Sequence, residues 1–126
     1  MSGPGGKVIK SFSNAFRGIA FLFNSQLNAR IELVLTGIVI IAGFFFRVGT
    51  TEWIVVLLCI ALVFGLEGIN TALEVFADKL HPGFDKEIGN MKDVAAGAVL
   101  IASIIAAIIG CIIFVPRIMD LILNLI

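Results

Sequence analysis

The sequence predicts an all-α membrane protein, with one N-terminal amphipathic helix at the interface and three transmembrane helices. The chain of 126 residues is 60% hydrophobic and 14% charged, with a mean hydropathy of +1.11. A soluble domain carries about 25% charged residues, so a soluble fold of this length could not bury so much apolar surface. Residues 1–126 are expected to form a single membrane domain. The net charge of zero gives no reason to expect nucleic-acid binding.

The interfacial helix is predicted over residues 7–25. Bulky apolar side chains recur at helical spacing, at Val8, Phe12, Phe16, Ile19 and Phe23. Basic and polar side chains take much of the opposite side, at Lys7, Lys10, Ser11, Asn14 and Arg17. A basic amphipathic helix with this many aromatic residues favours a position in the membrane interface.

The three spans are predicted over residues 29–48, 52–80 and 92–115, the second with a cytoplasmic extension. The charge-free run of the first, residues 33–46, is slightly short of the roughly 20 residues that a membrane helix needs, so residues 29–32 are expected to continue the helix at one end. A tight turn at 49–51 separates the first two spans, and His81-Pro82-Gly83 ends the second. Pro116 is expected to close the third span, leaving a short apolar tail in which Arg117 and Asp120 are solvated.

The positive charges predict the orientation. Four basic residues lie before or at the start of the first span, namely Lys7, Lys10, Arg17 and Arg30, and three lie around the loop between the second and third, namely Lys79, Lys86 and Lys92. Arg47 and Arg117 are alone on the other side. The positive-inside rule therefore predicts a cytoplasmic N-terminus and a C-terminus outside.

A polar stripe near the end of the second span is the feature that calls for a function. At 3.6 residues per turn, Glu67, Glu74 and Asp78 fall within roughly 40° of one another, and Asn70 lies within about 60° of Glu67. Thr71 sits on the edge of this stripe. Ionisable residues in a membrane helix are costly and rarely face lipid, so the stripe is expected to face protein or a polar site.

Three readings of the stripe stay open from its spacing alone. Carboxylates, an amide and nearby cations suit phosphoryl transfer, in which metal and cations offset phosphate charge. The same carboxylates suit a proton or ion path in a small transporter or channel. They also suit hydrogen bonds that hold an oligomer together. No P-loop or kinase glycine-rich loop is present, which excludes a soluble-kinase fold.

The run Glu67-Gly-Ile-Asn70-Thr-Ala-Leu-Glu74, then Asp78, then Lys92-Asp93-Val-Ala-Ala-Gly-Ala-Val99, resembles the signature of the prokaryotic diacylglycerol kinase family, which includes the undecaprenol kinases. The resemblance covers nearly the whole chain. It implies a homotrimer in a bacterial cytoplasmic (inner) membrane, with active sites between neighbouring subunits. It implies transfer of the γ-phosphate of Mg-ATP to the hydroxyl of a lipid alcohol at the cytoplasmic face, with Mg²⁺ as cofactor.

By position in this resemblance, Glu67 matches the general base and Glu74 a metal ligand. The positions implied to contact nucleotide or support its binding are Lys7, Lys10, Asn14, Arg17, Asn70, Glu74, Asp78, Lys92 and Asp93. One departure concerns the metal, because Gln26 stands where many members have a metal-binding glutamate. A glutamine offers a carbonyl oxygen without charge, and Glu32, about 1.7 turns further along, is a substitute carboxylate.

The substrate is left between two lipids. The loop His81-Pro82-Gly83-Phe84 and the small residues 95–98 look more similar to the undecaprenol kinase branch, so undecaprenol is favoured over diacylglycerol. A non-catalytic relative is a further alternative, for which Gln26 is the clue.

Overall fold

The computed structural model describes residues 3–126, and throughout this range the secondary structure is helical. The helices are α1 (Pro4–Ser25), α2 (Leu27–Phe45), α3 (Thr50–Leu80) and α4 (Lys86–Leu125). The last three are long and apolar enough to cross a membrane. The predicted all-α membrane fold is confirmed at this level.

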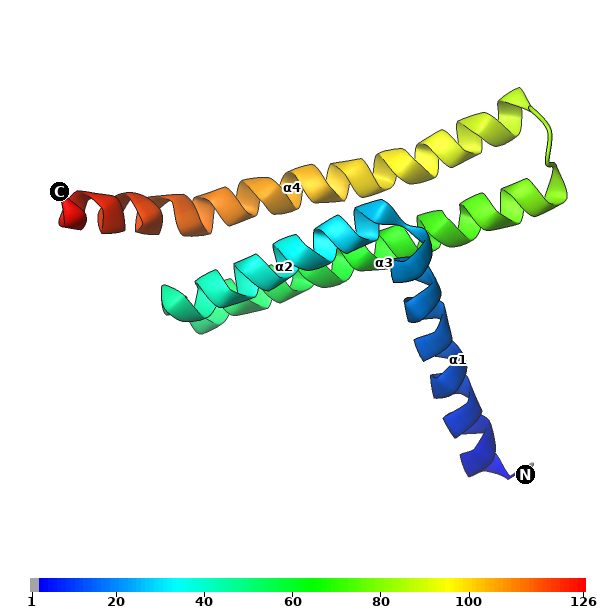
Figure 1. Ribbon diagram of the computed structural model, residues 1–126, viewed down its shortest axis with the longest axis horizontal. Coiled ribbons are helices and arrows are strands. Elements are labelled where there is room, and N and C mark those ends of the chain that lie inside the picture. Colours follow the sequence, from blue (N-terminus) through cyan, green and yellow to red (C-terminus); the bar gives the residue numbers. More distant parts are fainter. Residues whose placement is uncertain (1–2) are drawn as a thin grey trace.

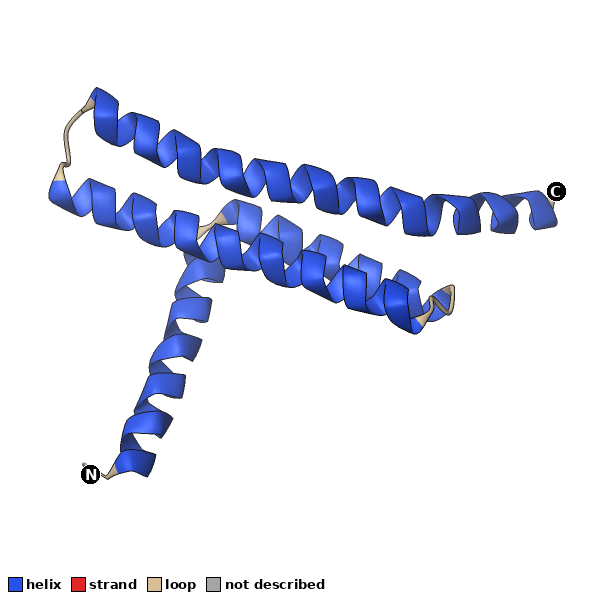
Figure 2. Cartoon of the chain, turned by 180° about the vertical axis from the view of Figure 1, so that it is seen from behind, coloured by secondary structure: helices blue, strands red, loops and turns tan. Residues whose placement is uncertain are grey.

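The three long helices run side by side as two consecutive hairpins, while α1 leaves them at a steep angle (Figure 1). Helix α4 packs along α3, and α2 packs on another side of α3 (Figure 2). No residue of α1 is buried. This arrangement fits a bundle that crosses the membrane and a helix that lies along its surface.

Helix α1 is attached to the bundle only at its C-terminal end. The rings of Phe23 and Phe64 meet edge to face with centroids 5.6 Å apart. Leu22 lies over Gly68, where an added Cβ would be 3.9 Å from the leucine methyl. Gln26, with φ −115° and ψ 116°, is the single extended residue that separates α1 from α2. The chain therefore turns from the surface into the bundle at Gln26.

An ion pair joins the turn between α2 and α3 to α4. Glu52 accepts a hydrogen bond from the backbone N–H of Gly49 at 3.0 Å and another from Nη2 of Arg117 at 2.7 Å. Nη1 of Arg117 also donates to the carbonyl oxygen of Ile113 at 2.6 Å. The prediction that Arg117 is simply solvated is therefore wrong, because its guanidinium is bonded on two sides.

The same end of the bundle holds the apolar core. Val48, Val56, Ile113 and Phe114 form one buried cluster, with Trp53 packed against it. Gly43 of α2 touches the indole of Trp53 so closely that an added Cβ would lie 2.6 Å from a ring carbon. A residue without a side chain is thus required at position 43 for the two helices to keep this spacing.

Helix α4 is longer than the predicted third span. It begins after Asp85, whose carboxylate accepts a hydrogen bond from the N–H of Ile88 at 3.0 Å. It continues through Pro116 to Leu125, so the helix does not end where the third span is predicted to close. A proline removes one N–H donor and weakens a helix without always ending it. The predicted end of α3 at Leu80, before His81-Pro82, is confirmed.

Candidate active site

The polar stripe on α3 runs from the interior of the bundle out to water. Glu67 is 3% exposed, and Asn70 and Thr71 are buried beside it. Glu74, two turns on from Glu67, is half-buried, and Asp78 is exposed. The stripe therefore faces protein at one end and solvent at the other, as expected for costly polar groups in a membrane helix.

Helix α2 brings a second carboxylate to the buried end of the stripe. Ala29 is fully buried, and Glu32, three residues later, lies on the same side of α2. The carboxylates of Glu32 and Glu67 are close enough to repel each other, and Glu74 repels Glu67 in turn. A cation bound between two such carboxylates would relieve their repulsion.

Three oxygen atoms at this place are buried without a hydrogen-bond partner: Oε2 of Glu32, Oδ1 of Asn70 and Oγ1 of Thr71. Most buried polar atoms in proteins have a partner, so these three oxygen atoms are candidates for binding a ligand. Carboxylate and amide oxygens are hard donors of the kind that Mg²⁺ prefers, and the donor set fits that ion. Among residues 3–126 no three acidic, cysteine or histidine side chains are grouped closely enough to hold a metal by themselves. The remaining ligands would be water or phosphate, which is common for Mg²⁺.

Lys92, one of the three lysines predicted to contact nucleotide, lies at the solvent end of the stripe. Nζ of Lys92 on α4 forms an ion pair with Oδ1 of Asp78 on α3 at 2.8 Å. Asp93 is exposed beside it. An exposed ion pair contributes little stability, about 0–1 kcal/mol, so a phosphate can replace Asp78 as the partner of Lys92 at little cost.

The predicted polar residues of α1 are not brought to the stripe within one chain. Lys7, Lys10, Asn14 and Arg17 are all exposed on a helix that points away from the bundle (Figure 1). Lys7 lies about 28 Å along the helix from Gln26. Gln26 itself is half-buried at the junction, close in sequence to Ala29 and Glu32. Their predicted roles therefore stay predictions.

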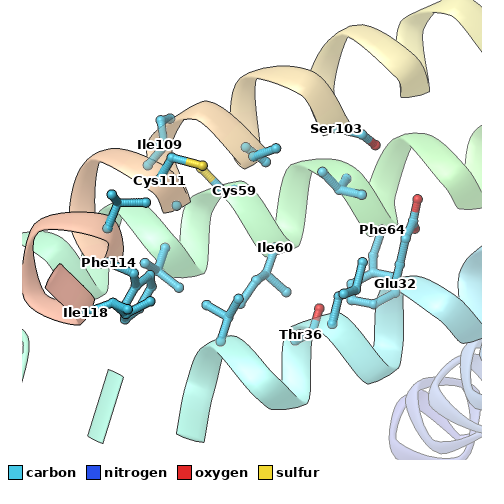
Figure 3. Close-up of a pocket in the computed structure, with 18 residues that line it drawn as sticks. Glu32, Thr36, Cys59, Ile60, Phe64, Ser103, Ile109, Cys111, Phe114 and Ile118 are labelled. Carbon is cyan, nitrogen blue, oxygen red and sulfur yellow. The ribbon is translucent and has the colours of Figure 1, made fainter. Parts of the chain in front are cut away.

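A groove between α2, α3 and α4 was missed from the sequence. It has a volume of about 460 Å³ and runs from Glu32 and Phe64 at one end to Phe114 and Ile118 at the other. Figure 3 shows that its few polar atoms come from side chains such as Thr36 and Ser103. Isolated small polar residues in apolar runs carry no periodic signal, because only the packing of three helices brings them to one groove.

Residues 13–114 match the family described as prokaryotic diacylglycerol kinase. The chain belongs to the prokaryotic diacylglycerol kinase family. It is therefore a lipid phosphotransferase, an undecaprenol kinase or a diacylglycerol kinase. The family implies ATP and a lipid as its substrates.

The chain is similar both to an undecaprenol kinase and to diacylglycerol kinases. The chain is 36% identical to the undecaprenol kinase of Bacillus subtilis over 115 residues, which is 88% of this chain and 90% of that protein. It is 35% identical to the diacylglycerol kinase of Synechocystis sp. over 90% of this chain and 66% of that protein. It is 26% identical to the diacylglycerol kinase of Escherichia coli K12 over 84% of this chain and 87% of that protein.

The matched region places the family's shared features on this fold. Residues 13–114 contain the whole α3 stripe, Glu32 and the Lys92-Asp93 pair. They leave out Lys7 and Lys10 at the start of α1 and the last turns of α4. The matched region thus covers the second half of α1, all of α2 and α3, and most of α4.

Proposed function

We propose that this lipid kinase transfers the γ-phosphate of Mg-ATP to undecaprenol. One observation carries the site assignment: Glu67 is buried beside unpartnered oxygens of Glu32 and Asn70, on a stripe that leads out to Lys92. The undecaprenol kinase relative, covered over 90% of its length, favours that lipid. Diacylglycerol is the second candidate, supported by the relative at 35% identity.

In this proposal Glu67 is the general base. Its carboxylate takes the proton of the lipid hydroxyl, and the hydroxyl oxygen forms a bond to the γ-phosphorus of ATP. The bond from that phosphorus to the β–γ bridging oxygen breaks, and ADP leaves with the electron pair. Glu67 then releases its proton to water. A buried base within hydrogen-bond reach of the alcohol typically contributes about 10²–10⁴-fold in rate.

The other residues bind and orient the phosphates. Lys92 turns from Asp78 to a phosphate oxygen and offsets its charge. Mg²⁺, when bound, supplies positive charge to the phosphates. Glu74 and Glu32 are the carboxylates that would hold it, with the side-chain carbonyl of Gln26 as a further oxygen. Asn70 and Asp93 complete the polar wall of the site.

The N-terminus and the α3–α4 loop are proposed to face the cytoplasm, and the chain is proposed to form a homotrimer. The basic residues of α1 and the lysines that flank the α3–α4 loop, Lys79, Lys86 and Lys92, support a cytoplasmic position for the N-terminus and for that loop. The phosphate donor then reaches the solvent end of the stripe from the cytoplasm of a bacterial cell. The resemblance to the family supports a homotrimer in the inner membrane.

The test is transfer of labelled γ-phosphate from Mg-ATP by the purified protein in mixed micelles, with undecaprenol and diacylglycerol offered in parallel. We expect label in both lipids or in undecaprenol alone, with the higher rate for undecaprenol. A higher rate for diacylglycerol would reverse the substrate assignment and keep the kinase.

A matched pair of variants tests the base. Glu67→Gln removes the carboxylate at the buried end of the stripe, and we expect a loss of about 10²–10⁴-fold in rate. Glu52→Gln makes the same change on the same helix at the opposite end, in the Arg117 pair. We expect near-normal transfer by Glu52→Gln. Unchanged transfer by a folded Glu67→Gln protein would remove Glu67 from the base role.

A further inference from the structure

The last turns of α4 project beyond the rest of the bundle. At 40 residues, α4 is about 60 Å long, roughly twice the thickness of the hydrocarbon core of a bilayer. Figures 1 and 2 both show its C-terminal end extending past the turn that joins α2 to α3. We refer to residues 118–126 as the distal segment. It lies outside the region matched by the family, which ends at Phe114.

Arg117 marks where the distal segment begins relative to the membrane. Its guanidinium is bonded to Glu52 at 2.7 Å and to the carbonyl oxygen of Ile113 at 2.6 Å. A charged pair at the end of a bundle belongs at the boundary between lipid and water. Arg117 lies about 37 Å along α4 from Lys92, which covers the hydrocarbon core. The distal segment therefore lies beyond the core.

The distal segment is nevertheless strongly apolar. Arg117, Asp120 and Asn124 fall within about 60° of one another around the helix and form one narrow polar stripe. The other positions carry exposed apolar side chains, namely Ile118, Met119, Leu121, Ile122, Leu123, Leu125 and Ile126. A helix continuing straight into water would leave this wide apolar face hydrated, which is unfavourable.

Pro116 gives the helix a place to bend. Proline has no N–H to bond the carbonyl of Ile112, and its ring crowds that carbonyl, so α4 is weakest just before the distal segment. Arg117 supplies a side-chain donor to the next carbonyl and keeps this weakened turn bonded. A bend at this turn would change the direction of the segment that follows it.

We propose that the distal segment tilts at Pro116 and binds the lipid interface at the membrane surface opposite the candidate active site. Its apolar face would enter the acyl boundary, and its polar stripe would face water. The membrane is the favoured occupant, because the α2–α3 turn of a second copy would end at the same level as that of the first and leave the segment uncovered. Arg117 and Asp120 balance in charge, so binding would show no preference for anionic lipids.

The test places a tryptophan on each side of the distal segment. Trp53 is the single tryptophan of the chain, so Trp53→Phe gives a silent background. Ile122→Trp puts the probe at the centre of the apolar face, and Asn124→Trp, the matched control, puts it on the polar stripe about 160° around the helix. Both proteins are reconstituted in phosphatidylcholine vesicles and quenched with lipids brominated near the head group or with aqueous iodide.

We expect Ile122→Trp to emit further to the blue than Asn124→Trp, with more quenching by brominated lipid and less by iodide. Equal and strong iodide quenching of both probes would place the segment in water and overturn the proposal. Quenching of Ile122→Trp by neither agent would place it against protein and would equally overturn it. If Trp53→Phe does not fold, spin labels on cysteines at 122 and 124 in a Cys59→Ala, Cys111→Ala background give the same comparison through oxygen and nickel-chelate accessibility.

Discussion

At the scale of single residues, two glutamates on α3, Glu52 and Glu67, lie in very different environments. Glu52 caps the start of the helix and is paired with Arg117. Glu67 is more deeply buried, is repelled by Glu32 and Glu74, and has no ion pair with a basic group among residues 3–126. A buried carboxylate without a cation is costly for stability, so a functional demand is the physical reason to keep it.

A substitution at Gln26 tests whether an uncharged ligand at this position weakens the binding of Mg²⁺. Gln26→Glu adds a carboxylate at the junction of α1 and α2, and we expect it to lower the Mg²⁺ concentration that gives half-maximal phosphate transfer. More ligand charge strengthens binding of hard cations. Asn28→Asp, which adds the same charge at an exposed neighbouring position, is the control. An equal shift in both variants would mean a general surface effect rather than a ligand at position 26.

Lys92 is expected to act on ATP rather than on stability. Lys92→Met removes an exposed ion pair, so the unfolding free energy should change by no more than about 1 kcal/mol. Loss of a charged hydrogen bond of about 1.5–3 kcal/mol to phosphate should raise KM for ATP roughly 10- to 100-fold. Steady-state kinetics with varied ATP measures this, with Lys86→Met, an exposed lysine at the start of α4, as the control. A normal KM in Lys92→Met would exclude a phosphate contact.

At the scale of the helices, most of the fold could be predicted, because long apolar runs and the turn-forming residues between them are strong signals. The end of α3 before Pro82 follows from the restriction that proline places on the preceding residue. At Pro116 the helix continues. A proline already inside a helix can be accommodated when a neighbouring donor, here Arg117, bonds a carbonyl of the weakened turn. The pairing of Arg117 with Glu52, 65 residues away in the chain, has no local signal.

The contact of Gly43 with Trp53 is a test of helix packing. Gly43→Ala places a Cβ 2.6 Å from the indole, and we expect a loss of about 1–3 kcal/mol in stability as α2 and α3 move apart. Gly37→Ala on the same helix meets nothing within 4 Å and should be neutral or slightly stabilising, by up to about 1 kcal/mol. Thermal unfolding in detergent, followed by the emission of Trp53, compares the two. Equal stabilities would show that the close contact is not maintained.

At the scale of the whole molecule, the packing of the helices decides which of the predicted site residues come together. The stripe on α3 could be predicted from a period of 3.6 residues, and the burial of Glu67, Asn70 and Thr71 agrees with it at the inner end. The approach of Glu32 to Glu67 and the groove beside them depend on how α2, α3 and α4 pack, which no local pattern encodes. The polar side of α1 is the reverse case, because its pattern is clear and yet the fold of a single chain directs it away from the stripe.

This geometry leads to a prediction about assembly. If Lys7 and Lys10 bind nucleotide, either α1 swings back about Gln26 or the two lysines serve the stripe of a neighbouring chain. Swinging about Gln26 would break the contacts of Leu22 with Gly68 and of Phe23 with Phe64, which fix the end of α1 on α3. A shared site keeps those contacts, so we expect the lysines to act on a neighbouring chain, in line with the trimer that the family resemblance implies.

Mixing two impaired proteins decides between these arrangements. Glu67→Gln lacks the base, and the double variant Lys7→Glu, Lys10→Glu reverses the charge at the far end of α1. Each alone should transfer phosphate poorly. Chains of both kinds, unfolded, mixed and reconstituted together, should recover activity, because some sites then combine an intact Glu67 with intact lysines from the neighbour. Activity no higher than the average of the separate proteins would show that each chain completes its own site, with α1 folding back at Gln26. Full activity of the lysine variant alone would instead remove α1 from nucleotide binding.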